Sequence, residues 1–182
     1  MKRILLIALM LSAFNLWSQE ESEKGPVSLV VTNGIDFVQN DSLIDVYNGN
    51  TRYFFGVGFE SFNRNLEIPK FLIQYSFSKS KVQDSVSFSQ HNFFLGGSFP
   101  MYATSKFALS SKFGVLMVVS NDFNPDLSYV TYGAQMGVEV EKVLIKDTKV
   151  FSSLTYNYQH VTTKNRVNLD MIRLAFGFKF RM

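Results

Sequence analysis

Apolar and polar residues alternate with a period of two through most of the chain after residue 27, and this pattern limits the possible folds more than any other feature. Successive side chains of a β-strand point to opposite faces of a sheet, so the alternation indicates strands and not helices. When every second residue of each alternating segment is counted, starting from the more apolar set, 36 of 41 positions are apolar or aromatic. The pattern predicts eight strands. They span roughly 28–38, 52–62, 70–78, 88–99, 107–119, 129–141, 149–160 and 169–181.

Each predicted strand has one apolar and one polar face, and the direction of the apolar face decides the class of protein. In a soluble barrel the apolar face forms the core, whereas in an outer-membrane barrel it faces lipid and the polar face lines the lumen. Eight strands enclose a space just wide enough for side chains, so 36 mostly bulky apolar groups do not fit inside. Eight of the eleven glycines lie on the polar face, which suits a crowded lumen. They are Gly34, Gly56, Gly58, Gly96, Gly114, Gly133, Gly137 and Gly177.

The sequence therefore predicts an all-β fold, an eight-stranded antiparallel up-and-down transmembrane β-barrel. The connections agree with this fold, because those at one end are on average longer than those at the other. Outer-membrane barrels have short periplasmic turns and longer external loops. Closing the sheet also leaves no open edge in the hydrocarbon. The expected outer connections are 39–51, 79–87, 120–128 and 161–168, and the expected periplasmic turns are 63–69, 100–106 and 142–148.

The first eighteen residues have the three parts of a secretory signal peptide. A basic start at Met1-Lys2-Arg3 precedes an apolar run over 4–14, and Ser18 provides a small residue at the expected cleavage point. The run is too short for a membrane anchor, which needs about 20 apolar residues. We therefore expect a cleaved Sec-type signal peptide over 1–18, a flexible lead-in over 19–26, and an outer-membrane β-barrel domain over 27–182.

Composition excludes several classes of protein. The chain has no Cys, which removes disulfides, thiolate metal sites, a Cys nucleophile and a lipoprotein anchor. Lys and Arg number 18 against 15 Asp and Glu, and they do not form blocks. Nucleic-acid binding needs a concentrated basic surface, so we expect no nucleic-acid partner.

Eight charged residues fall on the polar face of the predicted strands, and we expect them to form a lumen charge network. Isolated buried charges are very unfavourable, so these residues should pair. Glu60 and Lys70 are expected to pair across their hairpin, and Asp36 with Arg173 where the last strand closes on the first. A network that plugs the lumen is the simpler interpretation, and an ion-selective constriction is the alternative. The eight residues are Asp36, Arg52, Glu60, Lys70, Lys112, Glu139, Arg173 and Lys179.

Few other residues suggest chemistry. His91 and His160 fall near the expected outer rim, with Ser89 and Thr162 two residues away. A barrel hydrolase or acyltransferase would need a hydroxyl or carboxylate within about 3 Å of such a His, and a rim residue is the simpler interpretation. The oxygen-rich segment 121–126 lacks the Gly and terminal Glu of an EF-hand Ca²⁺ loop. We predict no catalytic, cofactor-binding or metal-binding residues.

Two segments resemble a known family. Leu66-Glu67-Ile68-Pro69 and the strand that follows resemble the "LEIP" turn and strand of the PorT-like outer-membrane β-barrel family, small porin-like barrels of Gram-negative bacteria. The aromatic alternation over 174–180 is similar to the last strand by which barrel-assembly machinery recognises its clients, although the chain ends Arg181-Met182. The resemblance implies the fold and an outer-membrane location. It implies no catalytic residues, and some members of the family serve in secretion machinery.

We therefore expect a non-catalytic integral outer-membrane protein with a structural, surface-interaction or secretion-accessory role in the cell envelope. Its expected partners are outer-membrane lipids, the barrel-assembly machinery and other envelope proteins, and no cofactor is expected. Three alternatives stay open at this point. They are a small porin-like channel for ions or hydrophobic solutes, a lipid-modifying barrel enzyme, and a soluble periplasmic lipid-binding barrel.

Overall fold

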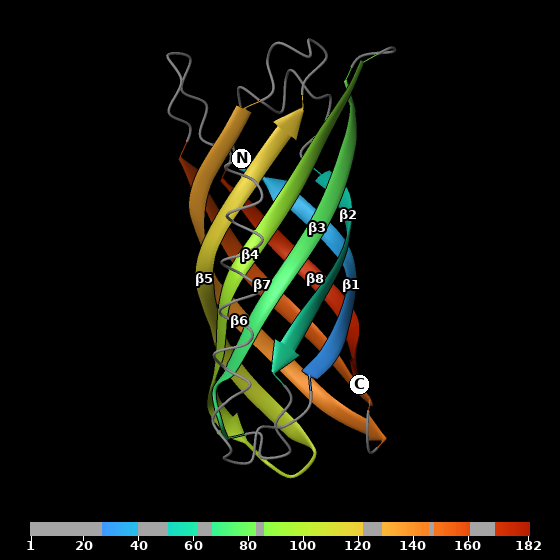
Figure 1. Ribbon diagram of the computed structural model, residues 1–182, viewed down its shortest axis with the longest axis vertical. Helices are drawn as coiled ribbons and strands as arrows, with labels where there is room; N and C mark the ends of the chain where they lie inside the picture. Colours follow the sequence, from blue (N-terminus) through green and yellow to red (C-terminus); the bar gives the residue numbers. More distant parts are fainter. Residues whose placement is uncertain are drawn as a thin grey trace, which may run out of the picture.

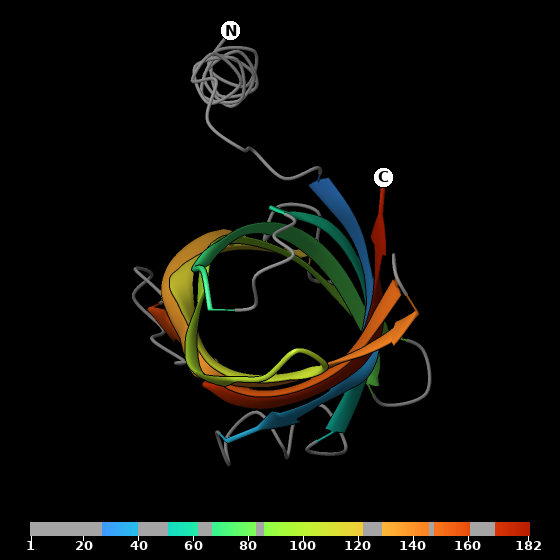
Figure 2. The same cartoon turned by 90° about the horizontal axis from the view of Figure 1, so that it is seen from below.

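The described part of the chain forms eight strands that close into one antiparallel barrel (Figures 1 and 2). Each strand pairs with its sequence neighbours, and the last strand pairs with the first. The computed structural model describes residues 27–39, 51–61, 67–82, 86–121, 129–145, 148–160 and 170–182. The strands are β1 (Val27–Val38), β2 (Thr51–Ser61), β3 (Lys70–Val82), β4 (Val86–Ala103), β5 (Phe107–Asn121), β6 (Tyr129–Ile145), β7 (Thr148–His160) and β8 (Met171–Arg181). These residues contain no helix long and apolar enough to cross a membrane.

The number, order and pairing of the predicted strands are confirmed, but several strands are longer than expected. The β3–β4 hairpin continues until only 83–85 connects its strands. β4 and β6 continue past their predicted ends. The register of β4 shifts between Pro100 and Tyr102, and that of β6 shifts between Val143 and Ile145, so the alternation is interrupted there. Such irregularities interrupt the alternation without ending a strand. The signal peptide and lead-in predicted over 1–26 lie outside the described residues.

The two ends of the barrel differ in their connections. The β2–β3, β4–β5 and β6–β7 connections lie at one end, called here the short-turn end, where the C-terminus also lies (Figure 1). The β1–β2, β3–β4, β5–β6 and β7–β8 connections lie at the other, the long-loop end. Connections at the long-loop end are longer on average, in the sense expected of an outer-membrane barrel.

The register determines how wide the lumen is. A path that steps from Ser28 through successive paired residues around the barrel returns to β1 at Val38, ten residues further on, so the shear number is 10. With a rise of about 3.3 Å per residue and strands about 4.8 Å apart, this shear tilts the strands by about 40°. The resulting cylinder has room for side chains and for little else.

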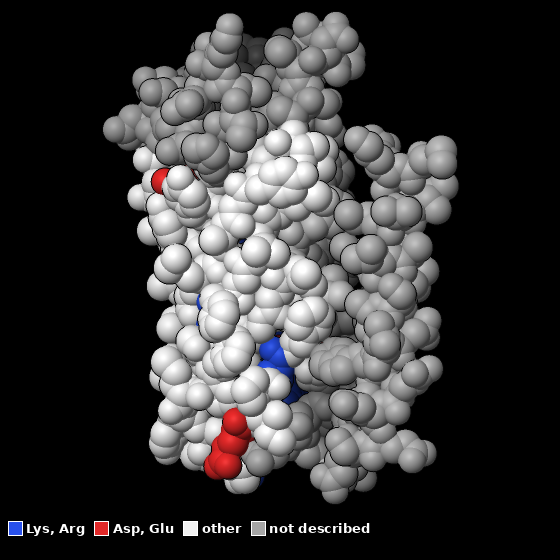
Figure 3. Space-filling view, turned by 60° about the vertical axis from the view of Figure 1, so that its left-hand side comes forward, with Lys and Arg blue, Asp and Glu red and all other residues white. Residues whose placement is uncertain are grey.

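The apolar face points outward and the polar face points inward. Phe113 and Met136 are 53% and 55% exposed, whereas ten charged side chains of the described strands are at most 7% exposed. Figure 3 shows one side of the molecule on which charged atoms occupy only small patches of the described surface. Soluble proteins have the opposite arrangement. The alternative of a soluble lipid-binding barrel, which needs the apolar face inside, is therefore wrong.

Three phenylalanines lie on the inward face, and they fill space next to glycines. Phe54, Phe94 and Phe151 are 3–4% exposed. Gly96 and Gly114 face each other across β4 and β5, and a Cβ added to either would lie 2.5–2.7 Å from the Phe94 ring. Any larger side chain would collide with that ring and with the neighbouring backbone. These glycines are therefore required for the close packing of the lumen.

Replacing Gly114 with Val should destabilise the barrel, because the new Cβ would lie 2.4 Å from the carbonyl oxygen of Leu95. Overpacking of this kind lowers the free energy of unfolding by about 1–3 kcal/mol. Urea titration of the refolded barrel in detergent micelles measures the change. Ala134→Val on the outward face of β6 is the matched control and should unfold with the wild type. Equal losses in both variants would contradict the packing described here.

Candidate functional site

The inward-facing charges form two groups, and the larger one fills the lumen at the short-turn end. Lys179 on β8 is the centre of this group. Its Nζ lies 2.8 Å from Oε1 of Glu60, 2.6 Å from Oε1 of Glu139 and 3.1 Å from Oε2 of Glu141. The same ammonium lies 5.0 Å from the centre of the Phe151 ring. One cation thus binds carboxylates from β2 and β6 on different sides of the lumen.

Three further lysines complete this group, which we call the inner network. Lys112 donates to Oε2 of Glu139 at 3.4 Å, and Lys149 donates to Oε1 of Glu141 at 3.1 Å. Lys70 also binds Oε1 of Glu141. Four lysines and three glutamates therefore join six of the eight strands across the lumen. The inner network consists of Glu60, Lys70, Lys112, Glu139, Glu141, Lys149 and Lys179.

The second group lies nearer the long-loop end. Arg173 binds Asp36 through two parallel hydrogen bonds, from Nε at 2.6 Å and from Nη2 at 2.8 Å, and it donates to Ser76 at 2.9 Å. Bidentate pairs of this kind are among the strongest charge-assisted hydrogen bonds. Its guanidinium also lies 4.0 Å from the centre of the Phe54 ring. This group therefore ties β8 to β1, β2 and β3.

Arg52 belongs to the same half of the lumen. It donates from Nη1 to Oε1 of Gln90 at 3.1 Å, and Gln90 donates in turn to Ser120 at 3.3 Å. Several buried amides nearby, among them Asn92 and Asn157, have no hydrogen-bond partner within the described part of the chain. Buried amides without protein partners are places where ordered water is expected. Among the described residues, the long-loop half is therefore less completely bonded than the inner network.

All eight residues expected in the lumen face inward, and each is at most 5% exposed. Asp36 and Arg173 pair where β8 closes on β1, as the strand order suggested. The expected pair of Glu60 and Lys70 is wrong. The β2–β3 register places Glu60 opposite Leu72, and Glu60 binds Lys179 while Lys70 binds Glu141.

Sequence reasoning missed Glu141 and Lys149, which are both members of the inner network. They stand at the ends of the predicted segments 129–141 and 149–160, next to the predicted turn 142–148, and were not among the eight charged residues expected in the lumen. β6 in fact continues to Ile145 and β7 begins at Thr148, so both side chains lie within the barrel. Glu141 is in phase with Glu139, and this spacing is the signal that could have identified it.

His91 lies on the outward face of β4. Its Nδ1 lies 2.8 Å from the hydroxyl of Tyr75 on β3, and Ser89 is not hydrogen-bonded to it. The His160 side chain, Thr162 and the oxygen-rich residues 122–126 lie outside the described residues. Within the described ranges, no group of three or more His, Asp or Glu could hold a metal ion.

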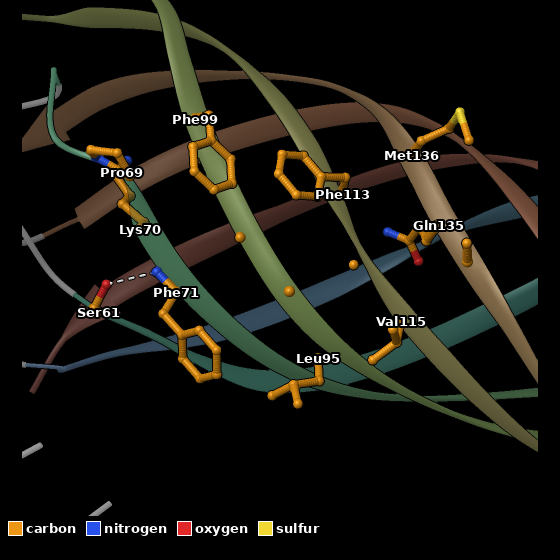
Figure 4. Close-up of a pocket in the computed structure, with 14 residues that line it drawn as sticks. Ser61, Pro69, Lys70, Phe71, Leu95, Phe99, Phe113, Val115, Gln135 and Met136 are labelled. Carbon is orange, nitrogen blue, oxygen red and sulfur yellow. Dashed lines mark hydrogen bonds between the residues drawn. The ribbon is translucent and has the colours of Figure 1, made fainter. Parts of the chain in front are cut away.

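The outward face carries a shallow apolar groove of about 670 Å³ across β3 to β6. Phe99 and Phe113 stack above Gly97 on one side of it, with ring centres 4.5 Å apart (Figure 4). At its short-turn end, the Phe71 N–H donates to the Ser61 hydroxyl at 2.9 Å (Figure 4). The groove is open to the surroundings of the barrel, and its lining includes Lys70 of the inner network.

Comparison with solved structures finds a similar fold in several bacterial proteins. Neisserial surface protein A matches with a TM-score of 0.65 and 10% identity, over 88% of this chain and all of that one. The attachment invasion locus protein Ail of Yersinia pestis matches with a TM-score of 0.55 and 13% identity, over 86% and 99% of the two chains. The outer membrane protein OprG of Pseudomonas aeruginosa gives 0.52 and 12%, over 88% and 98%.

At these identities the likeness establishes the fold alone. No protein-family model matches the chain, and no curated protein matches it significantly. The eight-stranded barrel is thus confirmed, whereas membership of the PorT-like family stays a prediction.

Replacing Lys179 with Met should strongly destabilise the barrel, because it leaves three buried carboxylates without their shared cation. Loss of one partner from a buried ion pair typically lowers stability by about 3–5 kcal/mol. Denaturant unfolding of the refolded protein in lipid vesicles measures the effect. Lys142→Met, an exposed position on β6, is the control and should change stability little. If the two variants were equally stable, the inner network would not be a structural tie.

Proposed function

We propose that this chain is a non-catalytic integral barrel of the outer membrane of a Gram-negative bacterium. One observation carries the proposal. Among the described residues, 28 large apolar side chains are exposed, most of them on the outward face of the strands, while ten charged side chains are buried. Such a surface is stable when lipid covers it, and a closed barrel is one of only two structures that satisfy the backbone in hydrocarbon. A Sec-type signal peptide over 1–18 would deliver the chain.

The role that this geometry supports best is one performed by the outside of the barrel. The inner network joins strands across the lumen at the short-turn end, so a solute would have to break buried ion pairs to pass. The surface-interaction reading draws support from the fold neighbours, because one is named a surface protein and another an attachment invasion locus protein. We propose envelope structure, surface interaction or an accessory part in secretion as the function, with lipids, barrel-assembly machinery and envelope proteins as partners.

The membrane barrel is tested by its behaviour on a gel. A closed barrel resists detergent until it is boiled, so the full chain expressed in a Gram-negative host should fractionate with outer membranes. It should also migrate differently with and without boiling. Recovery in the periplasmic extract, or a single mobility under both conditions, would contradict the proposal.

The closed lumen is tested in planar bilayers. The refolded barrel should give no steady single-channel conductance, because the inner network blocks the lumen. The channel alternative predicts steady conductance whose ion selectivity changes with Lys112→Glu. Steady conductance with altered selectivity in Lys112→Glu would show that the barrel is a small channel. A wild-type barrel without conductance would exclude the channel alternative.

A further inference from the structure

Two basic side chains stand where the outward apolar stripe of the β3–β4 hairpin ends. On β3 the outward positions are apolar or aromatic from Phe71 to Phe77, and the next outward residue is Lys79. On β4 the apolar stripe reaches Phe93, and the next outward residue is His91. Lys79 is exposed and His91 is half-buried. Both residues lie toward the long-loop end, at the edge of the surface that we propose to be immersed in lipid.

The imidazole of His91 is held in place by its neighbours. The Tyr75 hydroxyl lies 2.8 Å from Nδ1, and the Phe77 ring, directly opposite on β3, has its centre 5.1 Å from the imidazole centre. When the hydroxyl donates to Nδ1 of a neutral imidazole, the ring proton is on Nε2. In that arrangement, Nε2–H is left as a donor for a ligand.

Lys79 is close enough to act together with His91. Lys79 pairs with Ser89 and Phe77 pairs with His91, so Lys79 and His91 are diagonal neighbours on the outward face. Diagonal neighbours on a sheet are about 7–8 Å apart, within reach of long side chains. Neither Nε2 of His91 nor Nζ of Lys79 is bonded to any residue in the described ranges. Two donor-bearing residues thus lie next to each other on the outward face of the hairpin.

We propose that Lys79 and His91 bind the phosphate of a membrane lipid at the long-loop boundary of the apolar surface. The inference rests on the proposed function, since it needs the barrel to be embedded in lipid. The phosphate oxygens accept a hydrogen bond from Nε2 of His91 and form an ion pair with the ammonium of Lys79. The acyl chains lie against Phe77 and Phe93. A phospholipid would contact both the two basic residues and the aromatic surface beside them, whereas a free anion would contact only the basic residues.

Native mass spectrometry of the full chain in detergent tests this site, with dilauroyl phosphatidylglycerol and the uncharged dilauroylglycerol as probes. The wild type should bind the phosphatidylglycerol more tightly, and Lys79→Gln/His91→Phe should bind it about tenfold more weakly, the factor that corresponds to 1.4 kcal/mol. Tyr75→Phe should weaken it by a smaller factor, because Tyr75 only positions the imidazole. Lys142→Gln, at the short-turn end of β6, is the matched control and should bind as the wild type does.

Each variant is first checked for the heat-dependent mobility shift, which separates this inference from the proposed function. Equal phosphatidylglycerol binding by the wild type and a shifted double variant would overturn the site and leave the membrane barrel intact. If the wild type showed no heat-dependent mobility shift, both the lipid site and the membrane barrel would be overturned. Equally tight binding of inorganic phosphate would overturn the assignment to a lipid. Should the double variant not fold, Lys79→Gln alone, an exposed change, must weaken binding, and unchanged affinity would contradict the site.

Discussion

The hydrogen bonding of β8 to β1 is the interaction on which the rest of the structure depends. Eleven residue pairs join these strands, from Ser28 with Arg181 to Val38 with Met171. An open sheet would expose a row of unpaired N–H and C=O groups, which hydrocarbon does not tolerate. Closure removes that edge and so allows the apolar face to point outward. The same closure confines the polar face to a narrow lumen, where every charge must find a partner.

The last strand also supplies the two cations that tie the lumen together. Arg173 and Lys179 bind acidic residues of β1, β2 and β6, so the strand that closes the barrel also holds charges on three other strands. Both cations lie over the inward phenylalanines, Arg173 over Phe54 and Lys179 over Phe151. Cation–π contacts of this kind are stronger where water is excluded. Glycines beside the rings provide the space for this arrangement.

Local patterns were enough to predict the strands and their faces. Period-two alternation identified all eight segments, and the same phase placed residues such as Lys112 inside. Contacts across the lumen could not be predicted, because partners such as Glu60 and Lys179 are set by the shear of the whole barrel and not by spacing along the chain. The packing of the inward phenylalanines could not be predicted for a related reason. A ring such as Phe94 breaks the polar phase, and the glycines that accommodate it lie on neighbouring strands as well as its own.

The central claim is that alternate residues of each strand face lipid and lumen. Because the chain has no Cys, single cysteines placed one at a time from Ala134 to Val140 on β6 can carry a nitroxide spin label in reconstituted vesicles. Electron paramagnetic resonance then measures the collision of each label with oxygen, which is concentrated in lipid, and with a water-soluble nickel complex. Labels at Met136 and Val138 should collide mainly with oxygen, and those at Gln135 and Glu139 should not. A flat profile, or the reverse alternation, would contradict the account.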